Sequence, residues 1–566
     1  MAIVNVITLP QDVLDRVERV EEYHATTKHT AESMRTERHR LDAANKPYEF
    51  RVFEMLPPKS LPPGLLDLPV ATLELLAEGV QALPDSQIAP PQDLKSLATW
   101  LHFADGIAQK RRTVTSTQFT RTVASDGNTF PCELYIAAFA IDGLEPGLYH
   151  YSPREFALRK LRDGQETLAR LTRGRPDLAF LKTVPLAMMV STIFCRATWK
   201  FAKRGYRHAL HDAGYLIQNL VTVGSGLGIQ TITRLILNDS AARELIGVPA
   251  DADFAQAEAV QALVVWADRA NKPLAASIPA RAAAAPPDAQ SAQAGTPAAM
   301  ALSCPNPAMR PIQRALLAND VVSYVSILST HQDCVAPGVA VREVKPPLTD
   351  LTPLPSNVPV FQPPTPENEP RGEPLRKILL TRHPVTEFAP RHLTRDQFML
   401  INRLAFRGGT FYPLHPDGPH VALVRPFWLI HEVAGLDSGV WYYHPPTDSW
   451  SILRPGTFRR EAAMLSLQPV FAQGSATCFL VANLHHLMSV AGPDIYRLAH
   501  IEAGTVTNRL ALSTEALDLA WCETGTFYDD DARQFLGLRT TGWEMINIVA
   551  LGTRLREGEG AEAAST

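Results

Sequence analysis

The sequence predicts an α+β protein with two related domains, each an antiparallel sheet covered by helices. Segments of high β-propensity alternate with helical segments through both halves of the chain. In addition, the stretch 206–248 recurs at 496–538 without a gap, at an offset of 290, and eleven of the 43 paired residues are identical. Because this period is far longer than a solenoid repeat, we expect two homologous domains.

The composition is that of an ordinary globular protein. Of the 566 residues, 46% are hydrophobic and 20% are charged, which is enough for large buried cores. The net charge of −4 and the absence of a dense Lys/Arg run give no reason to expect nucleic acid. The six cysteines lie far apart, without metal-ligand spacing, as in a reducing compartment. Because neither a signal peptide pattern nor a membrane-spanning apolar run is found, we expect a cytoplasmic protein without a membrane segment.

In the first half, apolar residues at three- and four-residue steps predict a helix within 11–45. The polar run 23–29 has the composition of a solvated helix end, and prolines predict an extended arm at 47–63. The other expected elements are a helix at 91–107, strands at 133–141, 148–151 and 185–193, a long helix from 206 and a strand at 261–266.

The second half repeats this plan after a segment that cannot support a core. Residues 271–308 are rich in Ala, Pro, Ser and Gln, which is typical of a linker. The expected elements are a helical segment near 311–328, a proline-rich stretch at 346–374, a helix at 375–380, a turn at 381–386, a helix at 394–404, a strand at 427–433, a hairpin at 435–443, a strand at 478–484, the repeated helix and a strand at 546–551. The resulting divisions are an arm at 1–65, a first domain at 66–270, a linker at 271–310, a helix and proline-rich arm at 311–374, a second domain at 375–556 and a disordered tail at 557–566.

Several short motifs follow one another along the first half. They are Tyr23-His24-x-x-Thr27-Lys28-His29, the run S-x-G-N-x-F-P-x-E-L-Y from Ser125 to Tyr135, the run from Gly143 to Tyr151, and Trp199-Lys200-Phe201 followed by Tyr206-Arg207. In this order they resemble the SagB/ThcOx-type dehydrogenases of the FMN-dependent nitroreductase superfamily, over about residues 15–266 and more weakly over 375–556. The resemblance implies two nitroreductase-like domains, packed as an intramolecular pseudo-dimer that holds FMN. It also implies oxidation of peptide azolines to azoles beside a cyclodehydratase.

The second half keeps the phosphate-binding part of the flavin site that this resemblance implies. Its phosphate turn contains Arg382, His383 and Thr386, of which only Arg382 matches the family's arginines. Near the C-terminus, Arg554 can bring a second cation to the phosphate. The resemblance places Glu523, Thr524 and Gly525 in a turn at the flavin edge.

The first half keeps the part that contacts the flavin ring. The isoalloxazine turn is found only here, with Ser125, Gly127 and Asn128, and so is the lysine of the family's Lys-Tyr pair, at Lys200. Arg111 has basic neighbours like those of a phosphate turn, but its position after the second helix indicates a surface loop.

The complementary losses suggest one composite FMN site per chain. Arg382 would pair with the phosphate through charge-assisted hydrogen bonds. Backbone N–H groups of the turn at 125–128 would face the ring, and Gly127 would allow close approach. Two alternatives stay open: two degraded sites, and a flavin-free relic in which Arg382 and Arg554 are surface residues.

Lys200 is the candidate proton-transfer residue, since desolvation near a flavin would lower its pKa. A solvated lysine in a basic loop with Lys203 and Arg204 is equally compatible with the sequence. Phe201 stands where the family has tyrosine, so a phenol role is lost or passes to Tyr206. We interpret the remaining polar residues of the helices as satisfied helix or core residues: His211, Asp212, His485 and His486.

These features predict an FMN-dependent oxidoreductase that dehydrogenates a ring or amino-acid-derived unit on a peptide or carrier-bound biosynthetic intermediate. Dioxygen would reoxidise the flavin, and a cyclodehydratase or another biosynthetic enzyme would be the partner. One alternative is an NAD(P)H-dependent reductase of nitro, quinone or enone compounds. Another is a flavin-free scaffold that binds a peptide or a partner enzyme. A fused pseudo-dimer is compatible with a monomeric chain.

Overall fold

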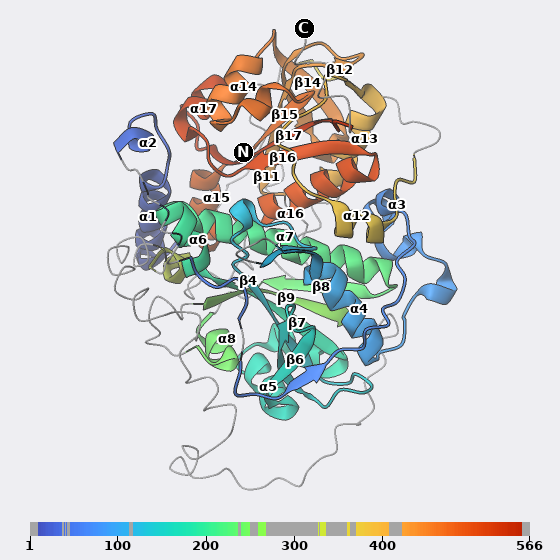
Figure 1. Cartoon of the computed structure of the whole chain (residues 1–566). Coiled ribbons are helices and arrows are strands. Elements are labelled where there is room, and N and C mark those ends of the chain that lie inside the picture. The colour runs from blue at the N-terminus through green and yellow to red at the C-terminus, as the bar shows by residue number, and fades with distance from the viewer. Residues whose placement is uncertain are drawn as a thin grey trace, which may run out of the picture. The chain divides into compact units, whose positions relative to one another are not determined.

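The chain forms two compact units in a computed structural model (Figure 1). Unit 1 comprises Met1–Arg40, Pro69–Glu78 and Ser329–Thr566, and unit 2 comprises Leu41–Leu68 and Gly79–Leu328. The structure describes residues 9–36, 39, 41, 43, 46–51, 53–112, 117–235, 239–248, 258–267, 327, 329–334, 359–362, 370–406 and 422–556. The expected linker at 271–308, the helical segment near 311–328 except residue 327, and the tail at 557–566 lie outside these residues.

Unit 2 is built on a seven-stranded antiparallel sheet with the strand order β1-β6-β5-β4-β7-β9-β8. Its strands are β1 (Pro58–Ser60), β4 (Cys132–Ala138), β5 (Gly147–Ser152), β6 (Ala157–Asp163), β7 (Leu186–Ile193), β8 (Gln230–Leu235) and β9 (Glu258–Ala267). The central strands β4, β7 and β9 are buried along their whole length, because helices cover both faces.

Helices of unit 2 lie on the two faces of this sheet (Figure 1). The helices α4 (Leu94–Asp105) and α7 (Gly205–Gly226) pack together on one face, where the indole N–H of Trp100 donates to the carbonyl oxygen of Leu220 at 2.8 Å. On the other face, α5 (Gly164–Thr172), α8 (Asp239–Ile246) and the short helix η5 (Pro176–Thr183) enclose a core with Met189, Leu263 and Leu245. Nearly every residue of α7 is buried.

Unit 1 contains a six-stranded antiparallel sheet with the strand order β14-β13-β11-β15-β17-β16. Its strands are β11 (Val424–Ile430), β13 (Gly439–His444), β14 (Ser449–Pro455), β15 (Ala476–Ala482), β16 (Leu519–Thr524) and β17 (Glu544–Thr553). The helices of this unit are α1 (Gln11–Thr26), α2 (Ser33–Thr36), α3 (Thr72–Glu78), α12 (Leu375–Thr381), α13 (Arg395–Phe406), α14 (Arg459–Ser466), α15 (Leu484–Ala491), α16 (Asp494–Ala516) and α17 (Asp529–Phe535).

The two sheets share one topology. The order β6-β5-β4-β7-β9-β8 in unit 2 corresponds strand by strand to the complete order in unit 1. The long helices α7 and α16 begin the two copies of the repeat, and each packs on its own sheet. Asn219 and Arg509, which are paired by the offset of 290, make similar hydrogen bonds. Asn219 donates to Ala104 O at the end of α4, and Arg509 donates to Leu404 O near the end of α13. The antiparallel, helix-covered sheets expected from the sequence are therefore confirmed.

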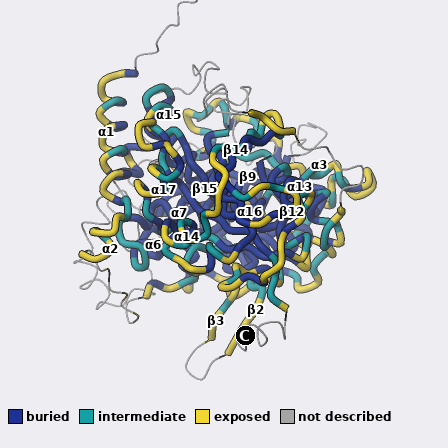
Figure 2. The backbone as a smooth tube through the Cα atoms, turned by 90° about the horizontal axis from the view of Figure 1, so that it is seen from above, coloured by how far each residue is buried: buried dark blue, intermediate teal, exposed yellow. Residues whose placement is uncertain are grey.

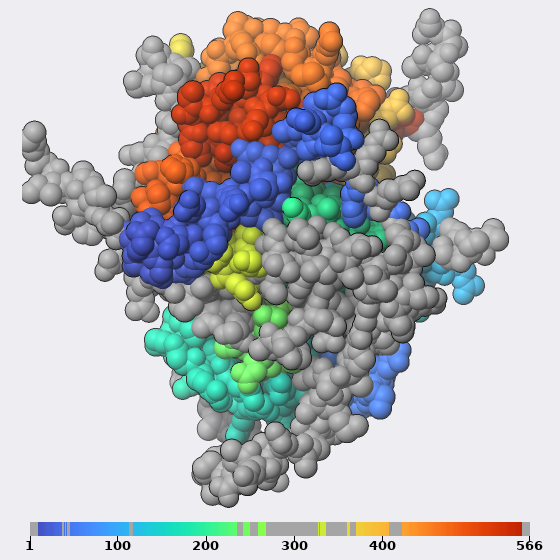
Figure 3. All heavy atoms as spheres, turned by 90° about the vertical axis from the view of Figure 1, so that its left-hand side faces the viewer, coloured from blue at the N-terminus to red at the C-terminus, as the bar shows by residue number. Residues whose placement is uncertain are grey.

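The helix α1 packs on α15 within unit 1, although it is at the other end of the chain. Figure 3 shows the blue N-terminal atoms against the red and orange C-terminal atoms of this unit. His24 lies between the Tyr496 hydroxyl, 3.3 Å from its Nδ1, and the Glu544 carboxylate, 3.3 Å from its Nε2. Lys28 Nζ pairs with the same carboxylate at 2.8 Å. The expectation of a solvated helix end at 23–29 was wrong, because His24 and Thr27 are buried in these contacts.

Three other local expectations need correction. Among the described residues within 11–45, only Gln11–Thr26 and Ser33–Thr36 are α-helical. The basic segment around Arg111 is not a loop but the strand β2 (Ile107–Arg112), paired with β3 (Thr117–Arg121) and exposed for most of its length (Figure 2). Glu523 and Thr524 are the last residues of β16 and do not belong to a turn. No described helix is both long enough and apolar enough to cross a membrane.

Candidate functional site

The predicted isoalloxazine turn of unit 2 is a tight bend with left-handed backbone. It contains the short helix η4 (Asp126–Asn128), in which Gly127 has φ of 60° and Asn128 has φ of 55°. Phe130 follows with φ of 43°. Such angles favour glycine and asparagine, which explains two of these residue choices in local terms.

The carboxylate of Asp212, on α7, holds this turn in place. Its Oδ2 accepts a hydrogen bond from Ser125 Oγ at 2.5 Å, and its Oδ1 accepts one from the backbone N–H of Asp126 at 2.9 Å. Burial raises the pKa of Asp212 well above its usual range. The interpretation of Asp212 as a satisfied helix residue therefore agrees with its contacts. Two of the N–H groups that were expected to face a flavin are used within the protein: Asp126 N–H donates to Asp212, and Asn128 N–H donates to Ser125 O.

Lys200 lies directly on the turn. It is near the end of α6 (Phe194–Phe201), partly buried, and its Nζ donates to the carbonyl oxygen of Gly127 at 2.8 Å. A Cβ at position 127 would lie 2.5 Å from Lys200 Nζ. The glycine therefore makes room for Lys200, and the interpretation of Lys200 as a solvated loop residue is wrong. Gly127 and Lys200, which only the family resemblance connected in the sequence, are therefore in contact.

Next to Lys200 is a pair of residues that the sequence analysis did not single out, of which His208 is buried and Asp126 is partly buried. His208, on α7, is hydrogen-bonded through Nδ1 to the carboxylate of Asp126. Its imidazole is stacked on the ring of Phe201, with ring centres 3.6 Å apart and planes 9° apart. Burial alone would raise the pKa of Asp126, but His208, His211 and Lys200 lower it below its usual range. The available signal was its spacing on α7, where His211 and Asp212 follow His208 by three and four residues and so share its face.

Tyr206 is fully buried in α7, and its ring packs edge-on against Phe194 at 5.5 Å between ring centres. His211 is also buried, and burial lowers its pKa to about 3. Both side chains therefore belong to the helix core of unit 2, and a catalytic role for Tyr206 stays a prediction.

Other residues of the resemblance motifs form a separate buried network. Glu133 accepts from His150 Nε2 at 2.8 Å and pairs with Arg196 at 2.6 Å. Burial opposes ionisation of Glu133, but the charges of Arg196 and His150 hold its pKa well below the usual range. The Tyr135 hydroxyl donates to Glu258 at 3.1 Å. These motif positions are explained by a charge-balanced interior, in which each buried ion has a partner.

In unit 1, Arg382 directly follows α12 and is buried. Its Nη1 donates to the Asn508 side-chain oxygen at 2.5 Å, and its backbone N–H donates to Ile378 O at 2.8 Å. Burial lowers the pKa of Arg382 to about 10, while the negative charge of Glu515 acts in the opposite direction. A guanidinium remains charged at that pKa, so Arg382 is a fixed interior cation.

Arg554 belongs to the same charged group. Its Nη2 contacts Glu515 Oε2 at 2.5 Å and Leu519 O at 3.2 Å. The Trp521 indole donates to the other oxygen of Glu515 at 3.1 Å. Of the two predicted phosphate ligands, Arg554 pairs with Glu515, and the charge of the same carboxylate also acts on Arg382. Two guanidinium groups and one carboxylate leave one net positive charge.

The other predicted residues of unit 1 are more scattered. His383 is exposed and its Nδ1 lies 3.0 Å from Thr381 O, and Thr386 is also exposed. Glu523 Oε2 accepts a hydrogen bond from the Asn547 side chain at 3.4 Å. The Thr524 hydroxyl donates to Thr526 O at 3.0 Å, and Gly525, between these two threonines, is buried. His485, interpreted as a satisfied helix or core residue, is exposed on α15 and paired with Glu21 at 2.6 Å. His486, one residue further along α15, donates its backbone N–H to the side chain of Asn483 at 3.3 Å.

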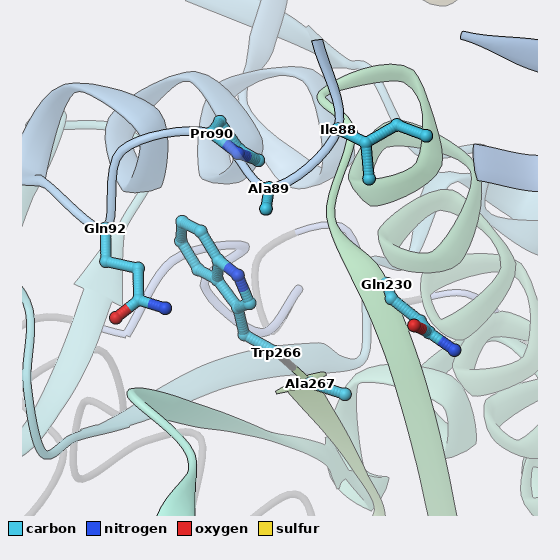
Figure 4. Close-up of a pocket in the computed structure, with 8 residues that line it drawn as sticks. Ile88, Ala89, Pro90, Gln92, Gln230, Trp266 and Ala267 are labelled. Carbon is cyan, nitrogen blue, oxygen red and sulfur yellow. The ribbon is translucent and has the colours of Figure 1, made fainter. Parts of the chain in front are cut away.

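A cavity of about 300 Å³ lies in another part of unit 2 (Figure 4). It is bordered by the loop at Ala89 and by Gln92, Gln230 and Trp266. The Trp266 ring packs edge-on against Trp100, with ring centres 5.8 Å apart. Among the residues that the structure describes, the lining of this cavity includes none of the predicted site residues.

The donor chemistry of both units is compatible with a flavin mononucleotide. The net positive charge at Arg382, Arg554 and Glu515 suits a phosphate. The turn of unit 2 combines a lysine ammonium with an exposed Asn128 amide, which are donors suited to the carbonyl groups of a flavin ring. The residues present therefore fit the cofactor, and their assignment to it remains a proposal.

Parts of the chain are similar to proteins of the nitroreductase family. The model of the nitroreductase family matches residues 85–264. A nitroreductase candidate from Methanocaldococcus jannaschii is 25% identical over 158 residues, which cover 28% of this chain and 76% of that protein. The crystal structure of a nitroreductase candidate from Anabaena variabilis matches with a TM-score of 0.69 and 21% identity, over 95% of this chain and 99% of that chain.

The similarity to the Anabaena protein shows that nearly the whole chain has a nitroreductase-like fold. The E. coli microcin synthetase McbBCD complex, with a truncated pro-MccB17 bound, is also similar, at a TM-score of 0.27 and 18% identity, over 45% of this chain and 93% of that chain. A TM-score of that size supports no conclusion about chemistry. The family model therefore matches part of the chain, and the similarity of fold extends over nearly all of it.

Proposed function

We propose that this chain is an FMN-dependent oxidoreductase that dehydrogenates a ring or amino-acid-derived unit on a peptide or carrier-bound biosynthetic intermediate. Azoline-to-azole oxidation is the reaction that the SagB/ThcOx-type resemblance favours. The observation that carries the proposal is the contact between Lys200 Nζ and Gly127 O, 2.8 Å apart within the region that matches the nitroreductase family. It joins the two motifs that the resemblance assigns to the flavin ring.

Each unit contributes residues of a distinct kind to this proposal. Arg382 and Arg554 would bind the phosphate of FMN, since they supply the net positive charge of their group. The turn from Ser125 to Asn128 would bind the ring, with its shape fixed by Asp212. When bound, FMN supplies the hydride-accepting oxidant. Lys200 would orient the substrate or move its proton, because its ammonium group lies at the turn.

The matching topology of the two sheets supports a further part of the proposal, namely that the chain is a tandem duplication. The offset of 290 joins Tyr206 to Tyr496, each in the first turn of a long buried helix. In the related family two domains share their flavins, so a duplicated chain would need no second copy.

The flavin content of the purified chain tests the proposal. We expect a yellow protein whose flavin is released by heat and identified as FMN by chromatography. A peptide azoline should then bleach the bound flavin without oxygen, and air should restore its colour. A protein that neither contains FMN nor binds it on titration would overturn the proposal in favour of a flavin-free scaffold.

A second candidate is an NAD(P)H-dependent reductase of nitro, quinone or enone compounds. The matching family and both relatives named as nitroreductases favour this direction of electron flow. Anaerobic mixing of the FMN-loaded protein with NADPH distinguishes the two. Rapid bleaching would support the reductase, whereas flavin that NADPH leaves oxidised and a peptide azoline reduces would support the dehydrogenase.

A further inference from the structure

Among the described residues, the imidazole of His208 has a hydrogen-bond partner at Nδ1 but none at Nε2. Its Nδ1 is hydrogen-bonded to the Asp126 carboxylate, and the side chain is 2% exposed. Its Nε2 is buried, and no hydrogen-bond partner for this atom is found among the described residues. Leaving a buried polar atom without a partner is costly, so such an atom calls for a functional explanation.

The charges around the ring determine which nitrogen carries the proton. Asp126 is surrounded by His208, His211 and Lys200, which stabilise its ionised form. An ionised carboxylate only accepts hydrogen bonds, so Nδ1 must be the donor. Burial, together with Arg204 and Arg207, lowers the pKa of His208 and favours the neutral ring, while Asp126 acts in the opposite direction. In a neutral ring that is protonated at Nδ1, Nε2 carries a free electron pair.

The neighbours of this ring are the residues of the proposed flavin site. Phe201 is stacked on His208 at 3.6 Å, and Lys200 Nζ lies 5.6 Å from the centre of the Phe201 ring. Asp126, which holds the imidazole, lies between Ser125 and Gly127 of the turn. Phe201 occupies the position of the family's tyrosine but has no ionisable group. The imidazole stacked on this ring supplies an ionisable group in direct contact with it.

We infer that His208, oriented by Asp126, is the proton-transfer residue of this chain and takes the role of the missing tyrosine. The inference rests on the proposed function and names a group that acts in the same site. In the dehydrogenation, the substrate C–H bond would break with its electron pair passing as hydride to the oxidant that bound FMN would supply. A neighbouring N–H or C–H bond of the substrate gives its proton to Nε2 of His208, where a new N–H bond forms. The electron pair left behind becomes the new double bond of the product.

Imidazole ¹⁵N NMR of the full-length chain, labelled at histidine, tests this inference without a turnover assay. His208→Phe identifies the resonances of His208 by difference. Asp126→Asn provides a second assignment if His208→Phe does not fold, because it should move the proton of His208 from Nδ1 to Nε2. Phe201→Tyr is the matched control, since it keeps the stacked ring and should leave the protonation of His208 unchanged. His485, exposed in unit 1, is the internal reference.

We expect His208 to be protonated at Nδ1 and free at Nε2, and we expect saturation with FMN to shift the Nε2 resonance while His485 stays in place. Two results would overturn the inference but leave the proposed function intact. One is an Nε2 that is already protonated in the unmodified chain. The other is an Nε2 resonance that does not respond when absorbance shows the chain saturated with FMN. Failure to bind FMN at all would contradict the proposed function, and this inference with it.

Discussion

Asp212 and Glu502 occupy the same position of the internal repeat and hold the same part of their units. The carboxylate of Asp212 accepts the backbone N–H of Asp126 at 2.9 Å, shortly before β4 begins. The carboxylate of Glu502 accepts the backbone N–H groups of Leu423 and Val424, at 2.9 Å and 3.0 Å, where β11 begins. In both units, a buried acid on the long helix thus fixes the chain as it enters a central strand.

Changing Asp212 should therefore loosen the turn that we assign to the flavin ring. Asp212→Ala removes the acceptor of two donors and should lower the free energy of unfolding by roughly 1–3 kcal/mol for each unmet bond. Asp212→Asn should cost less, because its amide oxygen still accepts Asp126 N–H. Urea unfolding followed by circular dichroism measures both variants. Equal stability of Asp212→Ala and the parent chain would show that the acid does not hold the turn.

Glu502 predicts a specific pH dependence. Burial raises its pKa to about 7, above the ordinary 4.5, although the bonds from Leu423 and Val424 act in the opposite direction. Folding therefore favours the protonated acid, and its contribution to stability is lost as pH rises from 4.5 to about 7. Glu502→Gln keeps an acceptor but does not ionise. Measured by urea unfolding across that range, its stability relative to the parent should rise with pH; a constant difference would contradict the shift.

The contacts of His24 and Lys28 with Glu544 predict that stability depends on pH in the opposite sense to the Glu502 effect. Burial alone would raise the pKa of Glu544, but the bonds and charges of His24 and Lys28 lower it to about 2. This stability is fully present above the ordinary pKa of 4.5 and is lost as pH falls towards 2. The shift corresponds to a contribution on the order of 3 kcal/mol.

Replacing Glu544 by Gln should accordingly destabilise unit 1 at neutral pH by an amount of that order and make its acid unfolding less steep. Tryptophan fluorescence during acid titration follows the effect, since unit 1 contains several buried tryptophans. Glu18→Gln, at an exposed position of α1, is the matched control and should behave like the parent chain. If both variants unfold alike, α1 is not fixed by this carboxylate.

Lys200→Ala tests the contact with Gly127. If Lys200 orients the substrate or moves a proton, the variant should retain FMN while turnover per bound flavin falls by roughly 100- to 10,000-fold. The neighbouring Lys203→Ala should retain turnover. Unchanged turnover of Lys200→Ala would reduce the role of Lys200 to filling the space beside Gly127.

Arg382→Ala should weaken FMN binding. Loss of a charge-assisted bond costs roughly 1.5–3 kcal/mol, or about ten- to hundredfold in affinity. Arg111, exposed on β2, is the control, and Arg111→Ala should bind FMN like the parent. Titration of FMN into both apo-proteins, followed by flavin fluorescence, compares them. If Arg111→Ala loses affinity and Arg382→Ala does not, the phosphate has been assigned to the wrong residue.

The central strands were predictable because their sequences are continuous runs of β-branched and apolar residues. The hydrophobic pattern placed β4, β7, β9, β11, β15 and β17 close to their observed bounds. The strands β8 and β16 were missed, since Gln230–Leu235 and Leu519–Thr524 contain polar residues on edge strands, where alternation is weak. The burial of His24 could not be predicted from the sequence either, because its partners lie more than 450 residues further along the chain.

The candidate site was predictable only in part, for a similar reason. Gly127 and Lys200 were found through motifs, but their contact depends on the packing of α6 against the turn. Asp126 and His208 carry no motif, and their pairing arises only when α7 approaches η4. Sequence spacing does not encode such long-range pairs, so the charged partners of a site are its least predictable part.

The number of FMN molecules bound per chain tests the central claim most directly. Reconstituted protein should be freed of excess flavin, and the bound flavin should be released by heat and measured by absorbance against the protein concentration. The complementary motifs of the two halves predict about one FMN per chain. A chain that retains no FMN would contradict the proposal that this protein is a flavoenzyme. A ratio near two would contradict the proposal of a single FMN site per chain.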